Sequence, residues 1–263
     1  MHEESGLSNL EASQLSGDQV VLLYRQGEHE VYWIGTRQET VFRCNSYLLR
    51  DGAEQILVDP GGRTEFAQTL HRVSQICPPE QISGMVISHQ DPDVAASMGE
   101  WLARKPGMRV FTHPRVHILL SHYGVADYEL FPVERDGRFE LPSGAFIQFV
   151  DAPFLHSPGA ITTYDSGSRY LFSSDIWAAI TPEWRLLVED FTRHRTKLDL
   201  FHAEYMASNI AARGFVERIE SLKIDAILPQ HGEIIPGEMV PQALDYLRQL
   251  RCGTDLLYPD LTP

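Results

Sequence analysis

The sequence predicts an α/β fold in which two β-sheets pack face to face and helices cover their outer sides, a four-layer αββα sandwich. Strand-like apolar segments followed by helical apolar spacing occur twice along the chain, and no internal repeat or linker-like stretch divides the two halves. The 263 residues suffice for one large core. We therefore expect a flexible N-terminal arm over residues 1–18 and a single domain over residues 19–263.

The first half is expected to supply one sheet and its helices. Its predicted strands are rich in β-branched, aromatic and aliphatic residues: Val20–Tyr24, Val31–Gly35, Ser46–Leu49, Gln55–Asp59, Met85–Ile87 and Arg109–Thr112. Pro60–Gly62 predicts a turn. Helices are predicted over Thr64–Ile76, over Val94–Arg104 and after Pro114, a residue that suits a first helical turn.

The second half repeats the pattern. Its predicted strands are Phe146–Val150, Ala160–Tyr164, Arg169–Phe172 and Ala226–Leu228. A helical stretch is expected from Pro182 to Leu222 with at least one break, and a closing helix over Val240–Leu250.

Composition narrows the class of protein. The chain has 22 Lys and Arg against 36 Asp and Glu, a formal net charge of −14, which argues against binding nucleic acid or an anionic membrane. No apolar run reaches the length of a membrane span, and the acidic start does not resemble a secretory signal. The three cysteines are far apart and form no CxxC pair. This pattern fits a cytoplasmic protein without a disulfide scaffold.

Four polar segments each begin where a predicted strand ends, which is where α/β folds gather functional groups. They are Ser88–Asp93, Leu155–Pro158, Ser173–Asp175 and Pro229–Gly232. Together they supply three imidazoles and three carboxylates: His89, Asp91, Asp93, His156, Asp175 and His231. Such ligands suit borderline or hard metal ions. Each segment alone has an ordinary explanation as a turn, a loop or a helix cap, but the four in succession predict a metal site.

Spacing and charge favour two metal ions. In the segment from His89 to Asp93, alternate side chains can lie on one side of an extended loop, which Pro92 restricts. Three carboxylates leave two ferrous ions with about one net positive charge, which a bridging hydroxide neutralises. Asp175 stands alone in its segment and is the natural bridging ligand.

The order of these residues resembles the metallo-β-lactamase superfamily, and within it the di-iron branch, the flavodiiron proteins. That branch has the motif H-x-E-x-D-H, then a lone His, a bridging Asp and a final His. Further segments resemble its strands and ligand loops: Val31–Gly35, Asn45–Leu49, Leu57–Pro60, Tyr170–Asp175 and Leu228–Gly232. The resemblance covers most of the chain and implies the metallo-β-lactamase-like αββα fold.

The resemblance implies a ligand set with two departures. Asp91 replaces the Glu of the flavodiiron motif, and Val94 replaces its last His. One ion then has His89, Asp91, His156 and Asp175, while the other has only Asp93, His231 and the same bridge. Superfamily hydrolases carry H-x-H-x-D-H, so Asp91 favours iron over zinc, with manganese a further alternative. The pattern is most similar to a smaller group, the bacterial oxygen-binding di-iron proteins associated with chemotaxis receptors.

The resemblance implies O2 binding for sensing rather than turnover. Two ferrous ions with open positions can take O2 as a bridging peroxide, whose charge the ligands balance. Full reduction of O2 or NO needs more electrons, which flavodiiron enzymes obtain from a flavodoxin-like domain. We expect no flavodoxin or rubredoxin domain and no FMN on this chain. The alternatives are a metal-dependent hydrolase of esters, thioesters or lactones, and an O2 or NO reductase served by a separate donor. A homodimer and a chemoreceptor or other signalling partner are implied only by the resemblance.

Several flanking residues could shape the site without binding metal. Gln90 and Gln230 each adjoin a predicted ligand, and Phe154, Trp177 and Tyr205 could limit solvent access. Ordinary core packing remains the alternative for the three aromatic residues. His113 and His117 have the spacing of a helical metal pair, but no third ligand is near, so a solvated helix face is expected.

Overall fold

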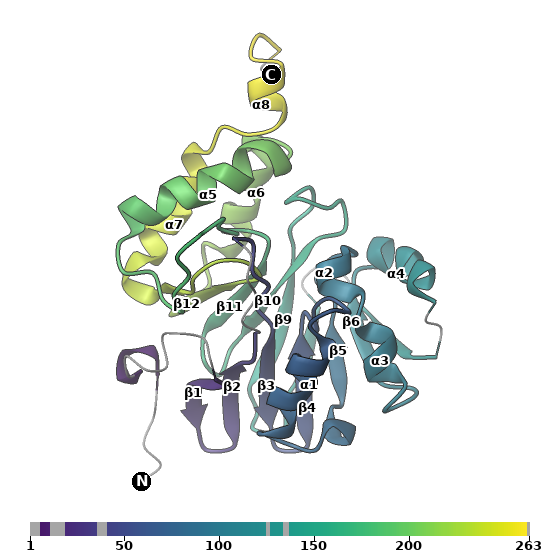
Figure 1. Ribbon diagram of the computed structural model, residues 1–263. Coiled ribbons are helices and arrows are strands. Elements are labelled where there is room, and N and C mark those ends of the chain that lie inside the picture. Colours follow the sequence, from purple (N-terminus) through teal and green to yellow (C-terminus); the bar gives the residue numbers. More distant parts are fainter. Residues whose placement is uncertain (1–5, 11–18, 36–40, 125–126, 134–136, 262–263) are drawn as a thin grey trace.

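The computed structural model describes residues 6–10, 19–35, 41–124, 127–133 and 137–261, and within them it has the predicted αββα layers (Figure 1). The first sheet has the strand order of the sequence: β1 (Val21–Gln26), β2 (His29–Trp33), β3 (Tyr47–Asp51), β4 (Glu54–Val58), β5 (Gly84–Val86), β6 (Arg109–Thr112) and β7 (Glu129–Pro132). Strands β1 to β4 pair antiparallel, and β4 to β7 pair parallel.

The second sheet has the order β13-β12-β11-β10-β9-β8. Its strands are β8 (Arg138–Glu140), β9 (Phe146–Asp151), β10 (Ile161–Asp165), β11 (Tyr170–Ser174), β12 (Ala226–Pro229) and β13 (Ile235–Pro236). Only β11 and β12 pair parallel in this sheet, so both of these strands end at the same edge.

Helices cover the two outer faces, one group on each side in Figure 1. The first sheet is covered by α1 (Phe66–Ser74), α2 (Pro92–Ala95), α3 (Met98–Leu102) and α4 (Pro114–Leu120). The second is covered by α5 (Phe191–Tyr205), α6 (Asn209–Ile219) and α7 (Val240–Gln249), and the short α8 (Thr254–Leu257) follows. Among the described residues, no helix is both long and apolar enough to cross a membrane.

Strands β2, β5, β10, β11 and β12 are buried on both faces, which explains their nearly continuous apolar sequences, whereas β7 and β8 are largely exposed. In β3, Tyr47 and Leu49 point into the core between the sheets, whereas Leu48 points to the helices of the first sheet. In β11, Phe172 faces the same central core and Leu171 faces the helices of the second sheet. Because alternate side chains of a strand point to opposite faces, apolar side chains fill three core layers: one between the sheets and one between each sheet and its helices.

The structure corrects the predicted helix at Pro182–Leu222. Residues before Phe191 are not helical, because Leu187 pairs with Ile234 and the Val188 N–H donates to the carbonyl oxygen of Ile234. Helix α5 begins after Asp190, whose carboxylate accepts bonds from the first turn of that helix. Two short helices, α2 and α3, replace the single helix predicted over Val94–Arg104. Strands β7, β8 and β13 were not predicted.

The predicted N-terminal arm is only partly described. Residues 1–5 and 11–18 lie outside the described residues. Within residues 6–10, a short 3₁₀ turn covers Leu7–Asn9, and Leu7 and Leu10 pack against the core between the sheets.

Candidate metal centre

The six predicted ligands come together at one edge of the sandwich. His89 follows β5, and Asp175 directly follows β11. His231 follows β12, and His156 lies in the loop between β9 and β10. Both sheets therefore contribute ligands, because the strands that precede these loops end on the same side of the molecule.

The loop from His89 to Asp93 differs from the predicted extended loop. Asp91 is extended, with φ −67° and ψ 152°, but Pro92 begins helix α2 and Asp93 lies in its first turn. Proline is well suited to this first helical position because it lacks an N–H. The extended stretch thus ends at Asp91, and Asp93 is placed by a helix.

The first half of the centre has two imidazoles on one carboxylate oxygen. His156 Nε2 lies 2.9 Å from Asp175 Oδ2, and His89 Nε2 lies 3.3 Å from the same oxygen. Asp91 Oδ2 lies 3.4 Å from His156 Nε2 and 3.8 Å from His89 Nε2. The ligand atoms of His89, His156 and Asp175 all lie within 4.8 Å of one another, close enough to share one ion.

The second half faces the other oxygen of the same carboxylate. His231 Nε2 lies 3.5 Å from Asp175 Oδ1 and 3.2 Å from Asp93 Oδ2. Asp175 thus presents one oxygen to each half, the arrangement expected of a bridging ligand. Its position follows from Ser174, which has a left-handed φ of 55° where the chain leaves β11.

The donor atoms fit bound cations. His89 Nε2 and Asp175 Oδ1 are buried and make no hydrogen bond, although burying an unsatisfied polar atom is costly. A metal ion between these imidazoles and carboxylates would satisfy both atoms. Imidazole and carboxylate together suit iron, zinc or manganese.

Mutual attraction perturbs the titration of these groups. Burial alone would lower the pKa of His156, but hydrogen bonds to Asp175 and Asp91 outweigh it and raise the pKa to about 10. The buried Asp175 carboxyl has its pKa held below the ordinary value by the three surrounding histidines, against the opposing effect of burial. Hydrogen bonding to His156 likewise lowers the pKa of Asp91. Before metal binds, the raised pKa of His156 therefore keeps a proton on that imidazole.

Metal affinity should consequently rise with pH. A proton held on His156 below a pKa of about 10 must leave before that nitrogen can bind metal. We expect Fe(II) affinity to increase by about tenfold per pH unit for each proton displaced, between roughly pH 6.5 and 8.5. Anaerobic Fe(II) titrations against a competing chelator at several pH values measure how steeply the affinity rises with pH. Calorimetry in buffers of different ionisation enthalpy counts the protons released on binding. An affinity that stays constant or falls with pH contradicts this assignment.

Groups behind the ligands fix the ring orientations. The Ser174 hydroxyl lies 3.1 Å from His89 Nδ1, and Ser88, whose N–H donates to Asp59, lies 3.2 Å from the same nitrogen. His231 Nδ1 lies 2.9 Å from the carbonyl oxygen of Arg43. The imidazoles of His89 and His231 are thereby oriented with Nε2 toward Asp175, as is usual for metal-binding histidines.

The two predicted glutamines have different environments. Gln90 donates to Asp91 Oδ1 and accepts from the Ser157 hydroxyl, so it orients a predicted ligand. The Gln230 side chain is buried, and its amide nitrogen and oxygen make no hydrogen bond. Its main chain is paired on both sides, with Ser174 and Asn45.

The three flanking aromatic residues also differ. Trp177 points into the core under α6 and α7, where its indole N–H donates to the Ala243 carbonyl, so it packs away from the ligands. Tyr205 is half-exposed, with its ring 6.0 Å from that of His156, and it stacks on Phe201 at 4.5 Å. Phe154 is half-exposed two residues before His156. Tyr205 and Phe201 therefore border the first half of the centre.

Two residues of the segment before β3, which the sequence did not predict as part of the site, lie beside His231. Phe42 stacks on the His231 ring with centroids 3.6 Å apart, and Cys44 pairs with His231 through an isolated β-bridge. Cys44 Sγ lies 3.8 Å from Asp93 Oδ2. Because these contacts join residues far apart in the chain, no local spacing in the sequence indicates them.

His113 and His117 are both partly buried rather than placed on a fully solvated helix face. His113 is the N-cap of α4 and accepts from the Arg115 N–H, and His117 Nδ1 lies 2.7 Å from the Tyr128 hydroxyl. Neither belongs to a group of three ligand-type side chains among the described residues.

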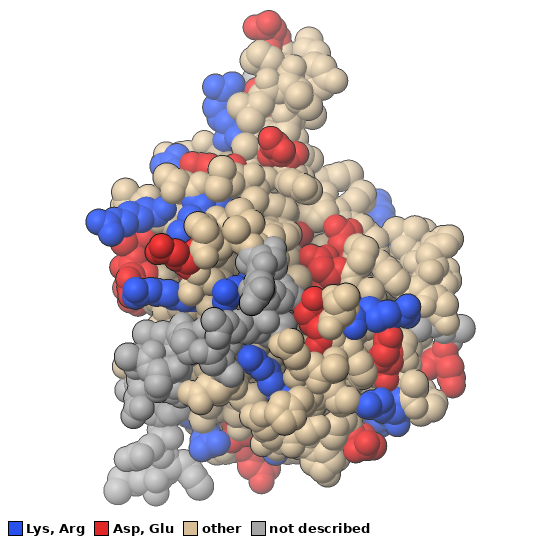
Figure 2. Space-filling model, in the orientation of Figure 1, with Lys and Arg blue, Asp and Glu red and all other residues tan. Residues whose placement is uncertain are grey.

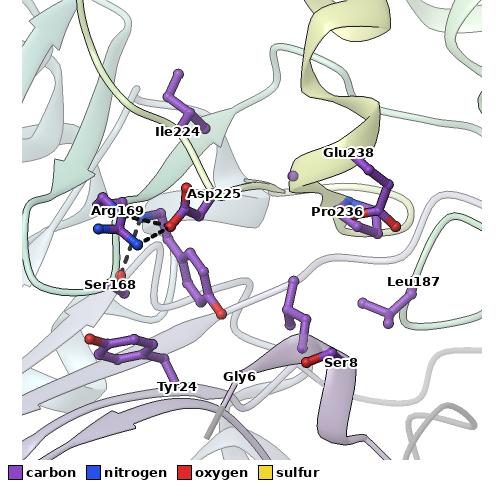
Figure 3. A pocket seen from close by; sticks show the side chains of 13 residues that line it. Gly6, Ser8, Tyr24, Ser168, Arg169, Leu187, Ile224, Asp225, Pro236 and Glu238 are labelled. Atoms are coloured by element: carbon purple, nitrogen blue, oxygen red, sulfur yellow. Dashed lines mark hydrogen bonds and ion pairs between the residues drawn. The ribbon is translucent and has the colours of Figure 1, made fainter. Parts of the chain in front are cut away.

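A separate surface pocket of about 580 Å³ lies at the ends of β11 and β12 that are opposite the candidate metal centre (Figure 3). Arg169 and Asp225, which precede β11 and β12, pair with each other on one side of it. These two charged groups therefore satisfy one another, and Glu238 also lines the pocket. On the molecular face in Figure 2, basic side chains are interspersed with acidic ones.

Solved structures match almost the whole chain. A structure described as the peroxy diiron species of the chemotaxis sensor ODP is 32% identical, with a TM-score of 0.82, and the match covers 91% of this chain and 99% of that chain. The apo state of the chemotaxis sensor ODP from T. denticola is also 32% identical, with a TM-score of 0.78, and the match covers 92% of this chain and 98% of that chain. The flavodiiron protein from Giardia intestinalis, 20% identical with a TM-score of 0.74, shares the fold; that match covers 82% of this chain and 56% of the other.

Curated sequences give more partial matches. The anaerobic nitric oxide reductase flavorubredoxin of Aeromonas salmonicida is 27% identical over 164 residues, which is 56% of this chain and 31% of that protein. This chain thus aligns with about a third of that relative's length. The family model described as ODP family beta lactamase matches residues 42–232, a span that contains all six predicted ligands. The chain therefore belongs to the ODP family of β-lactamase-like proteins.

Proposed function

We propose that the protein is a non-haem di-iron protein that binds O2 and serves as an oxygen sensor. The observation that carries this proposal is the convergence of three imidazole Nε2 atoms on the two oxygens of Asp175, with buried donor atoms that lack hydrogen bonds. The 32% identity to structures of the chemotaxis sensor ODP over nearly their full length supports iron and O2 as the ligands.

The proposal gives each ligand a role. One iron is bound by His89, Asp91 and His156, the other by Asp93 and His231, and Asp175 bridges them. Two ferrous ions in this site supply the electrons and open positions that O2 binding requires. Val94 is buried beside Asp93 and offers no ligand atom, so the second iron has fewer protein ligands than the first.

The surrounding residues have supporting roles. Gln90 holds Asp91 by its amide and is itself held by Ser157. The stacked rings of Phe201 and Tyr205 cover one side of His156 and restrict water there.

Rapid mixing tests the proposed O2 binding. Reduced protein loaded with two Fe(II) per chain is mixed with O2 and followed by absorption spectroscopy. We expect a new visible band that forms once and persists, then disappears on removal of iron. Immediate decay to the spectrum of the oxidised resting centre contradicts a sensing role. Elemental analysis that finds two zinc per chain, with ester hydrolysis, would favour a hydrolase instead.

The second candidate is an O2 or NO reductase served by a separate electron donor, which the flavorubredoxin relatives favour. Sustained consumption of O2 or NO after addition of a reduced flavodoxin or rubredoxin would support it. A single equivalent of O2 bound per di-iron centre, unchanged by the donor, would support the sensor.

We also propose a cytoplasmic protein that forms a homodimer and reports to a chemoreceptor or another signalling protein. Support for the location is the absence of disulfides among the three cysteines. Support for the partner is the description of the structural relatives as chemotaxis sensors.

A further inference from the structure

The Asp93 and His231 half of the centre contains a third side chain with a ligand atom, Cys44. The ligand atoms of Cys44, Asp93 and His231 all lie within 4.8 Å of one another. Ligands bound to one ion at about 2.3 Å for sulfur and 2.1 Å for oxygen lie about 3.6 Å apart when the geometry is tetrahedral. The separation of 3.8 Å between Cys44 Sγ and Asp93 Oδ2 is close to this value.

The main chain holds Cys44 in this position. Cys44 pairs with His231 across a β-bridge, and the Asn45 N–H donates to the Gln230 carbonyl oxygen at 2.6 Å. The Asn45 amide also donates to the carbonyl oxygens of Pro229 and Gly232, on both sides of His231. The thiol is therefore carried on the same rigid frame as a proposed ligand, which is how preorganised sites are built.

A second observation shows that a ligand atom in the Asp93 and His231 half of the centre has no partner. Asp175 Oδ1, the carboxylate oxygen on the His231 side, is buried and makes no hydrogen bond. Val94 provides no ligand atom, so this half has three proposed protein ligands against four in the other. A fourth anionic ligand would also balance the charge of two divalent ions against Asp91, Asp93 and Asp175, without a hydroxide.

We propose that Cys44 binds, as a thiolate, the metal ion that Asp93, His231 and Asp175 hold. The S–H bond is broken, its proton passes to solvent, and the sulfur lone pair forms the bond to the metal, with no change of oxidation state. The inference rests on the proposed di-metal centre and adds a ligand to it. It makes the two metal positions chemically different, one with nitrogen and oxygen ligands and one that also has sulfur.

Cobalt(II) tests the inference independently of O2 chemistry, because a thiolate bound to Co(II) produces an intense near-ultraviolet charge-transfer band. We expect this band in the native protein at two Co(II) per chain, and we expect Cys44→Ser to abolish it and weaken binding of one Co(II) by at least about tenfold. Cys77→Ser and Cys252→Ser, which replace buried thiols elsewhere, are the matched controls and should retain the band.

The outcomes separate the inference from the proposed function. Two Co(II) bound to native protein without a sulfur band, or a band that survives in Cys44→Ser, overturns the role of Cys44 and leaves the centre intact. Co(II) uptake that Asp175→Asn leaves unchanged overturns the centre itself. Thermal unfolding of the metal-free Cys44→Ser protein verifies that it folds, and Cys44→Ala, which removes the heteroatom, should also lose the band.

Discussion

Replacing Asp175 with Asn will remove both metal ions from the protein. Asp175 contacts all three proposed histidine ligands, at 3.3, 2.9 and 3.5 Å from His89, His156 and His231. The substitution removes a negative charge and replaces one carboxylate oxygen by an amide nitrogen, which only donates and cannot bind a cation, so one of the two bridging contacts is lost. We expect affinity for both ions to fall by more than the roughly 10- to 100-fold that follows loss of a group behind a ligand.

Two comparison variants make this result specific. Asp91→Asn changes a carboxylate on one side of the centre, so it should weaken one ion much more than the other. Asp245→Asn, on the exposed surface of α7, should retain two iron ions per chain. Iron analysis after gel filtration and circular dichroism give stoichiometry and folding. Two iron ions retained by folded Asp175→Asn would refute the bridging role.

Replacing His29 with Ala will destabilise the fold by about 3–5 kcal/mol, the usual cost of breaking a buried ion pair from one side. His29 Nδ1 lies 2.6 Å from Asp51 and its Nε2 lies 2.8 Å from Asp165, and all three side chains are buried. Asp51 ends β3 of the first sheet and Asp165 ends β10 of the second. His29 therefore joins the two sheets at the end opposite the metal centre, and its removal leaves two buried carboxylates without their shared cation.

This contribution should depend on pH with a defined sign. Burial lowers the pKa of His29, but the hydrogen bonds and charges of Asp165 and Asp51 outweigh burial, and the net pKa is raised. The stability that protonated His29 contributes is therefore complete below its unfolded pKa of about 6.5 and is lost as pH rises through the raised folded value. Denaturant unfolding of metal-free wild type and His29→Ala should show a difference that narrows from about pH 6 upward. The exposed His122→Ala serves as control, and equal stability of His29→Ala and wild type at pH 6 would disprove the role.

Most of the architecture could be predicted from the sequence because several strands bury both faces. Segments such as Val31–Gly35 and the Tyr170–Phe172 part of Arg169–Phe172 are continuously apolar, and the structure confirms the αββα layers that they predict. The prediction was wrong before Phe191, where a helical pattern gives way to pairing between Leu187 and Ile234. Such a long-range contact overrides local propensity and leaves no periodic signal.

The predicted ligands come together because each follows a strand, and strand order places their loops at one edge. In the segment from His89 to Asp93, however, the sequence did not predict the backbone conformation. Its alternate spacing predicted three side chains on an extended loop, yet Pro92 begins a helix and Asp93 reaches the centre from that helix. The structure supplies the distances, and the assignment of these residues as metal ligands stays a proposal that metal analysis must test.

By itself, the sequence determined the layered fold, the six imidazole and carboxylate side chains of the candidate centre, and the absence of a ligand atom at Val94. Those features are carried by residue type and by order along the chain. Only the tertiary structure decided that Asp175 presents one oxygen to each half, that Cys44 lies beside Asp93 and His231, and that His29 joins two carboxylates from different sheets. These contacts depend on which strand lies beside which, and that is set by packing of the whole core.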